Sequence, residues 1–215
     1  PMHSQDGHVV LTYNGEVYNF PELRQTLEAL GYSFRTHCDT EVIVYAYQAW
    51  GEDCVLRLRG MFAFAIWDRE QQTLFLARDR LGIKPLYYSQ TPSGQFIFAS
   101  ELKALKEHPD LPRTMDPTAI EEYFGFGYIP DPKTIYKDVY KLEPGFCLSI
   151  KRGTKGYQPR QYWDVNFSHS LQGSEGELSE ELIQRVREAV KIRTVADVPL
   201  GAFLSGGVDS SAIVA

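Results

Sequence analysis

The sequence reads Asn14-Gly15-Glu16-Val17-Tyr18-Asn19 at the end of a strand-like alternation that begins at His8. Asn-Gly is a common two-residue hairpin turn, so a hairpin is one interpretation. A second strand should then follow at once, whereas Phe20-Pro21 begins a helical pattern with Pro in the first turn. The same permissive backbone suits an oxyanion hole, in which the Asn14 amide and the Gly15 N–H converge on one oxygen. On spacing alone the two interpretations are equal.

The residues beyond this stretch predict a mixed α+β domain. A helix is expected from Pro21 to Leu30, because it has an apolar face and is followed by Gly31. A second is expected from about Thr40 to Trp50, with Asp39 or Thr40 as cap and Gly51 after it. A short helix is also expected near residues 117–124. Strands are expected at residues 61–67, 73–77, 85–89, 95–99, 135–142 and 146–150. Short strands joined by tight turns indicate antiparallel pairing.

A second informative stretch, Ser205-Gly206-Gly207-Val208-Asp209-Ser210-Ser211, lies near the end of the chain. The run Val198–Leu204 before it predicts a buried strand, and Ser211–Ala215 predicts a helix start. A glycine turn at a helix N-terminus is suited to an anion, because unpaired N–H groups and the helix dipole favour negative charge. Asp209 cannot bind an anion directly, so we expect it to bridge through a metal ion. The alternative is an ordinary capped turn.

The segment between these parts changes character. Residues 166–177 are rich in Ser and Gly without periodicity, which predicts a linker. Beyond it, Ser179 is expected to cap an amphipathic helix. The predicted organisation is therefore one domain at 1–165, the linker, and at 178–215 the first helix, strand and loop of an α/β domain.

The overall composition limits the choice of partner and compartment. A net charge of −6 and a pI near 5.4 argue against nucleic acid or an anionic membrane surface as a partner. The longest apolar run, Met61 to Trp67, is too short to span a bilayer, and no signal peptide opens the chain. Cys38, Cys54 and Cys147 are odd in number and widely spaced. This usage argues against a disulfide framework or a zinc site and fits a reducing cytoplasm.

The stretch at residues 14–19 resembles the N-G-E-I/V-Y-N signature of the class II glutamine amidotransferases. Further stretches, in the family's order, resemble its asparagine synthetase branch, so that the resemblance covers nearly the whole chain. These stretches are Cys38-Asp39-Thr40-Glu41, Arg78-Asp79-Arg80-Leu81-Gly82-Ile83-Lys84-Pro85-Leu86-Tyr87-Tyr88, Phe98-Ala99-Ser100-Glu101-Leu102-Lys103-Ala104-Leu105, Gly127-Tyr128-Ile129-Pro130 and Lys141-Leu142-Glu143-Pro144-Gly145. The loop at residues 205–211 resembles the pyrophosphate loop of enzymes that split ATP into AMP and pyrophosphate.

The resemblance implies an N-terminal-nucleophile fold, with antiparallel sheets packed between helices. It implies that a Cys at the mature N-terminus attacks the glutamine side-chain amide and that its own α-amine is the base. Carried over, Asn14 and Gly15 form the oxyanion hole, while Glu16 and Asp39 contact the bound glutamine. Asp39 would pair with the α-ammonium group, with a helix cap as its alternative role. Cys38 is internal and has no free α-amine, so it is not expected to replace the nucleophile.

The missing nucleophile and the Arg-bearing loop for the glutamine carboxylate are expected upstream of Pro1. Because that start also lacks an initiator Met, we expect a chain truncated at both ends that does not itself hydrolyse glutamine.

For the second domain, the resemblance implies that ATP activates the side-chain carboxylate of aspartate as β-aspartyl-AMP, which ammonia then converts to asparagine. The residues carried over to ATP binding are Leu204, Ser205, Gly206, Gly207, Asp209 and Ser210. Asp209 would also hold Mg²⁺. The implied small-molecule substrates are glutamine, aspartate and ATP, and the resemblance leaves a homodimer open.

Two alternatives remain at this point. One is an enzyme of the same build that amidates a different carboxylate, for instance in polysaccharide or secondary-metabolite assembly. The other is a glutamine-binding module without a nucleophile.

Four charged residues flank predicted strands: Arg78, Asp79, Lys84 and Glu101. We expect them to form buried or interdomain pairs rather than to take part in the chemistry.

Overall fold

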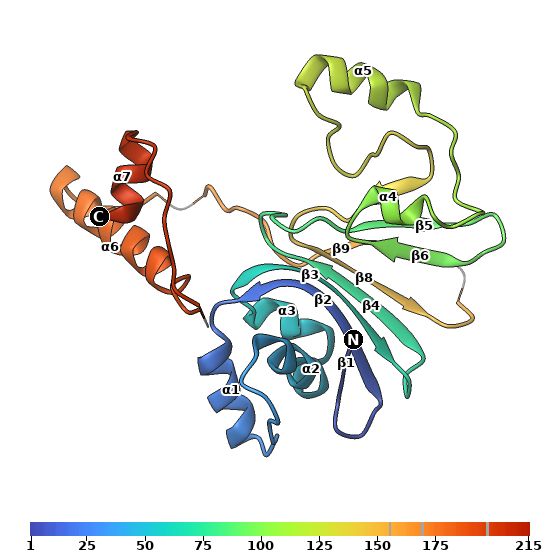
Figure 1. The fold of residues 1–215 in the computed structure, drawn as a ribbon, viewed down its shortest axis with the longest axis horizontal. Coiled ribbons are helices and arrows are strands. Elements are labelled where there is room, and N and C mark those ends of the chain that lie inside the picture. Colours follow the sequence, from blue (N-terminus) through green and yellow to red (C-terminus); the bar gives the residue numbers. More distant parts are fainter. Residues whose placement is uncertain (155, 169, 197) are drawn as a thin grey trace. The chain divides into compact units, whose positions relative to one another are not determined.

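The computed structural model describes residues 1–154, 156–168, 170–196 and 198–215 (Figure 1). These residues form two compact units, Pro1–Asp164 and Val165–Ala215. Helices and strands alternate irregularly in the first unit, and its neighbouring strands are antiparallel, which confirms the predicted α+β class. Among the described residues, no helix is long and apolar enough to cross a membrane.

The first unit is built on a six-stranded antiparallel sheet. Its strands, in spatial order, are β1 (Met2–His3), β2 (Val9–Val17), β3 (Gly60–Asp68), β4 (Thr73–Arg78), β8 (Phe146–Lys151) and β9 (Arg160–Gln161). β2 and β3 pair over their whole length. Because side chains alternate along each strand, the two faces of this sheet bury different residues.

Helices cover one face of this sheet, below β2 and β3 in Figure 1. They are α1 (Phe20–Ala29), α2 (Asp39–Trp50), the short 3₁₀ helix η1 (Gly51–Asp53) and α3 (Cys54–Arg57). Leu11 and Val17 of β2 pack with Ile43 of α2 in a fully buried core. The predicted helices at 21–30 and 40–50 are therefore confirmed. The first buries its apolar face, whereas residues 41–47 of the second are buried on all sides.

A second, three-stranded sheet covers the other face (Figure 1). Its strands, in spatial order, are β6 (Phe96–Ala99), β5 (Tyr87–Gln90) and β7 (Val139–Lys141). Ala63 and Leu76 of the large sheet pack against Tyr88 of β5. The predicted strand at 135–142 is thus shortened, because Asp138 adopts a positive φ of 60° and ends the extended run.

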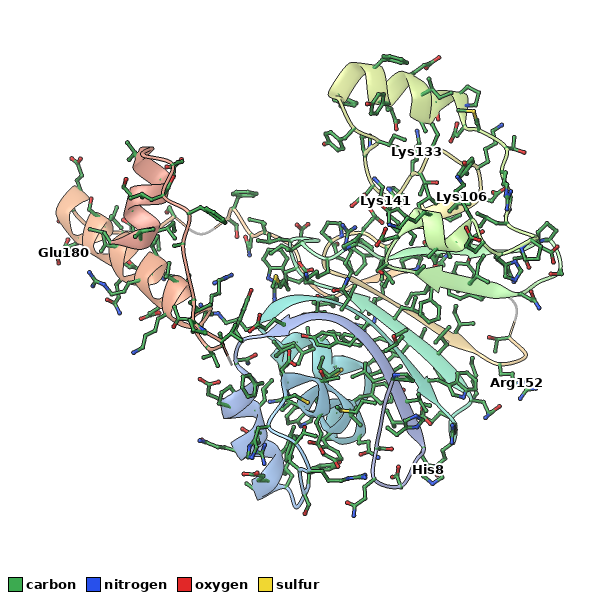
Figure 2. All side chains as sticks on the ribbon, viewed as in Figure 1. His8, Lys106, Lys133, Lys141, Arg152 and Glu180 are labelled. Carbon is green, nitrogen blue, oxygen red and sulfur yellow. The ribbon has the colours of Figure 1, made fainter. Side chains whose placement is uncertain are left out.

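Two helices extend the first unit beyond this second sheet. They are α4 (Leu102–Leu105) and α5 (Pro117–Phe126). Lys133 and Lys141 lie below α5 in Figure 2. The Lys133 ammonium binds Glu122 of α5, and the Lys141 ammonium binds Asp131. These ion pairs fix the segment that joins α5 to β7.

The second unit contains α6 (Glu175–Lys191) and α7 (Val208–Val214). Ser174 and Glu177 form a reciprocal capping box, so α6 begins inside the predicted linker and Ser179 is not its cap. The predicted strand at 198–204 does not form. A strand needs a neighbour for its backbone hydrogen bonds, and the described residues of this unit contain no other strand.

The predicted end of the first strand at Asn14-Gly15 is also wrong. β2 continues through both residues to Val17, so neither lies in a hairpin turn. A Cβ atom at Gly15 would lie 2.7 Å from the Cα atom of Phe62. Glycine therefore allows β3 to approach closely at this point, and the strand passes straight through it.

Candidate active site at the edge of β2

The outer edge of β2 is largely uncovered. β1 pairs only with Val10 and Leu11 of that strand. The N–H of Ser4 donates to the carbonyl of Val9, which shows that the odd-numbered residues of β2 turn their backbone groups to this edge. Within the described chain, no strand pairs with the edge from residue 12 to residue 17.

The N–H of Gly15 faces this open edge. Phe62 lies opposite Gly15 in the ladder. Its carbonyl accepts the Asp79 N–H at 2.7 Å, and its N–H donates to the Asp79 carboxylate at 3.2 Å. Because both backbone groups of Phe62 point to Asp79, Gly15 and Phe62 form a non-hydrogen-bonded pair. The Gly15 N–H is thus directed outward, as an oxyanion donor must be.

The side chains of Asn14 and Glu16 lie on the face of β2 that is turned toward the second sheet, opposite the face that the helices cover. Asn14 is exposed, and it lines a pocket of about 290 Å³ together with Phe98 and Ser100. Glu16 is half-buried. In the described part of the chain, neither side chain forms a hydrogen bond, so the Asn14 amide and the Glu16 carboxylate are both free to meet a ligand.

Asp39 reaches the same edge from α2. It is the first residue of that helix, and its Oδ2 atom accepts the Tyr13 hydroxyl at 2.6 Å and the Val17 N–H at 2.9 Å. The residue in the N-cap position is Cys38, and Asp39 makes no capping hydrogen bond. The alternative role of Asp39 as a helix cap is therefore wrong, because its carboxylate points across to β2.

The spacing along the edge is that of a small amino acid. Gly15 and Val17 are two residues apart, which places their N–H groups about 6.8 Å apart along the strand. The Val17 N–H holds Asp39. In glutamine, four bonds of about 1.5 Å separate the amide carbon from the α-nitrogen, a span of about 5 Å. An oxyanion on Gly15 and an ammonium group on Asp39 can therefore belong to one glutamine molecule.

Glu41 and Arg24 hold the loop before Asp39, and the sequence did not indicate either of them as a site residue. The buried carboxylate of Glu41 accepts the N–H groups of Arg35 and Thr36 and the Thr36 hydroxyl. Burial alone would raise the pKa of Glu41, but these hydrogen bonds outweigh it and the pKa is lowered. Arg24 donates to the Thr36 carbonyl at 2.6 Å. The signal for this role was the position of Glu41 in the motif that begins at Cys38.

Asn19, the last residue of the Asn14–Asn19 motif, has a structural role. The Asn19 amide nitrogen donates to the Arg57 carbonyl at 2.9 Å, and its oxygen accepts the Arg59 N–H at 2.8 Å. These bonds fasten the end of β2 to the segment that enters β3. Asn19 thus holds the end of β2 in place although it does not lie at the open edge itself.

Two of the three cysteines are unsuited to supply a nucleophile to this edge. Cys54 and Cys147 are buried in the core. Burial raises the pKa of the Cys54 thiol strongly and that of Cys147 to about 11, so neither is a thiolate near neutral pH. The Cys38 sulfur lies 3.0 Å from the Thr36 hydroxyl, in the cap of α2.

The second predicted site lies in the loop before α7. The Ser205 and Ser210 hydroxyls are hydrogen-bonded, and the Gly207 N–H donates to Ser205 at 3.4 Å. The structure thus brings these three residues together. Gly206 has a φ of 81°, which glycine adopts without strain. Leu204 is exposed beside the loop.

Asp209 lies in the first turn of α7, and its side chain is exposed. No cluster of three or more His, Cys, Asp or Glu side chains occurs among the described residues. One carboxylate fits Mg²⁺ that takes its other ligands from phosphate groups and water. Asp209 is therefore suited to hold such an ion, which would neutralise phosphate charge.

Comparisons with known proteins agree with the family resemblances of residues 14–19 and of residues 205–211. The family model of the glutamine amidotransferase domain matches residues 1–163, and that of asparagine synthase matches residues 181–215. The chain is 42% identical over 206 residues to asparagine synthetase [glutamine-hydrolyzing] 3 of Bacillus subtilis, covering 95% of this chain and 33% of that protein. It is 41% identical over 215 residues to asparagine synthetase 1 of the same organism, covering 100% and 33%. The chain spans about a third of the length of these relatives.

Among solved structures, the glutamine phosphoribosylpyrophosphate amidotransferase of B. subtilis superposes with a TM-score of 0.52 at 22% identity, covering 75% of this chain and 31% of that one. This likeness shows that the two share the N-terminal-nucleophile fold. The chain belongs to the glutamine amidotransferase domain family, and its residues 181–215 match the asparagine synthase family.

Proposed function

We propose that this chain is the glutaminase part, with the start of the synthetase part, of an enzyme that amidates aspartate to asparagine at the expense of ATP. The observation that carries the glutaminase assignment is the shared edge of β2. Gly15 N–H and the Asp39 carboxylate lie there at a spacing that fits the two ends of glutamine.

Each residue at that edge then has a defined task. The Gly15 N–H, with the Asn14 amide, stabilises the oxyanion that forms when the glutamine amide is attacked. Asp39 pairs with the α-ammonium group, and Glu16 contacts the substrate from the face of Asn14. The resemblance to the class II glutamine amidotransferases implies that the nucleophile is a Cys at the mature N-terminus of the full-length protein. Cys54 and Cys147 are buried and unsuited to that role.

In the second unit, the loop from Ser205 to Ser210 receives the phosphates of ATP, with Leu204 beside the nucleotide. The match of residues 181–215 to the asparagine synthase family supports this assignment. Mg²⁺ on Asp209 would supply charge neutralisation when pyrophosphate leaves. Aspartate as acceptor is supported by the names of the relatives, which are asparagine synthetases. The acyl-AMP intermediate is implied by the resemblance of the Ser205–Ser211 loop to the pyrophosphate loop, and both points are part of this proposal.

The test uses the full-length protein with glutamine, ATP and aspartate, and measures glutamate, asparagine, AMP and pyrophosphate. Equal amounts of the four products are expected. Glutamate release coupled to AMP only when another carboxylate replaces aspartate would identify a different acceptor. Glutamine binding without any glutamate release would instead indicate a binding module.

A further inference from the structure

Tyr13 joins β2 to the residue that would recognise the α-ammonium group. Its hydroxyl donates to the Oδ2 atom of Asp39 at 2.6 Å, across 26 positions of the chain. Tyr13 is half-buried, and it packs against the core formed by the helices and the large sheet. The packed ring fixes where the hydroxyl lies.

The two oxygens of Asp39 are used unequally. Oδ2 accepts both the Tyr13 hydroxyl and the Val17 N–H. Among the described residues, Oδ1 accepts only the Thr40 hydroxyl, at 3.3 Å, a long distance for a bond between oxygens. Two short bonds on one oxygen fix the plane of the carboxylate and leave the other oxygen to a cation.

Tyr13 can act only as a donor here. Burial, with the hydrogen bond to Asp39 and the nearby negative charges, raises the pKa of its hydroxyl far above the ordinary value. The hydroxyl therefore keeps its proton, and Asp39 is the acceptor.

We propose that Tyr13 is a positioning residue for glutamine: it holds Asp39 so that the Oδ1 atom meets the α-ammonium group of the substrate. This inference rests on the proposed function. It predicts that Tyr13 contributes to discrimination between glutamine and the same amide without the α-amino group. Tyr13 touches no reacting atom, so it should not affect the chemical step.

The test compares Tyr13→Phe with the unaltered full-length enzyme. The KM for glutamine should rise about 10-fold with little change in kcat, because a hydrogen bond to a charged group is lost in ground and transition states alike. The inhibition constant of glutaramate, which lacks the α-amino group, should stay unchanged. A general distortion of the site would weaken both ligands equally, and that result would overturn the proposal.

Tyr162→Phe is the matched control, because its hydroxyl donates to the Arg78 carbonyl at 2.7 Å and its ring packs on the same core. It should leave the KM for glutamine unchanged. Asp39→Asn separates the two hypotheses. If that change leaves the KM unaltered, the proposed glutamine site is wrong. If it raises the KM and Tyr13→Phe does not, only the positioning role is wrong.

Discussion

Asp79 and Phe62 exchange two backbone-directed hydrogen bonds, one from the Asp79 N–H to the Phe62 carbonyl and one from the Phe62 N–H to the Asp79 carboxylate. The carboxylate is 1% exposed. It also accepts N–H groups from the loop that follows β4, those of Leu81, Ile83 and Lys84. The buried Asp79 side chain and backbone thus bind both backbone groups of Phe62 in β3, so that these do not pair with Gly15. The backbone groups of Gly15 are therefore directed to the open edge of β2.

Asp79→Asn should lower the free energy of unfolding by about 2–3 kcal/mol, because an amide nitrogen cannot accept the N–H groups that the carboxylate oxygen holds. Urea unfolding of the 215-residue chain measures this change. Glu101→Gln is the control, since that side chain is exposed and forms an ion pair with Lys103. It should change stability by less than about 0.5 kcal/mol. Equal losses in the two variants would contradict the role of Asp79.

The charged residues that flank strands differ in burial. Arg78 and Asp79 are buried, as expected, and Arg78 pairs with Asp131 and with the carbonyls of Gly82 and Leu142. Glu101 is exposed, so it forms no buried pair, and an interdomain pair stays a prediction. All flank strands in the sequence, but burial depends on what the rest of the chain packs over each one, which local sequence does not contain.

Local signals predicted the elements that depend on local physics. The helices at 21–30 and 40–50 are each followed by a glycine, the first also shows an apolar face, and both form. The path of β2 through Gly15 was not predictable in this way, because it depends on the close approach of Phe62. The bond between Tyr13 and Asp39 likewise joins residues far apart in the sequence. The motif therefore indicated the candidate site residues, while their arrangement came only from tertiary packing.

Asn14→Ala in the full-length enzyme should lower the kcat for glutamine hydrolysis about 100- to 1,000-fold, as expected for one lost oxyanion donor. The KM should change little, because the oxyanion exists only in the transition state. Asparagine formation from ammonium salt should persist, since that reaction bypasses the glutaminase site. The measurement is glutamate release with glutamine, and asparagine formation with ammonium. An unchanged kcat would mean that Asn14 is only a residue of β2 and is not an oxyanion donor.

Glu41 should make the loop before α2 sensitive to acid. Its pKa is lowered in the folded chain from an ordinary value of 4.5. The stabilisation is therefore fully present above about pH 5 and is lost as the pH falls through the folded pKa. Glu41→Gln should be less stable at neutral pH and lose less stability between about pH 6 and about pH 3. Urea unfolding at several pH values measures this difference.

The exposed Glu22 in the first turn of α1 provides the matched comparison for that change. Glu22→Gln should keep both the stability at neutral pH and the acid sensitivity of the unaltered chain. A Glu41→Gln curve parallel to that of the unaltered chain would mean that other carboxylates cause the acid response.

Asp209→Ala in the full-length enzyme should abolish AMP and pyrophosphate release with glutamine and with ammonium alike. The only carboxylate of the Ser205–Ser211 loop is lost, so the charge that develops on pyrophosphate would not be neutralised. Glutamine hydrolysis should persist at least in part, because the edge of β2 is unchanged. Glu180→Ala, on the exposed surface of α6 (Figure 2), should retain both reactions. If Asp209→Ala cleaved ATP at the normal rate, the residues from Ser205 to Ser211 would be no more than a turn that begins α7.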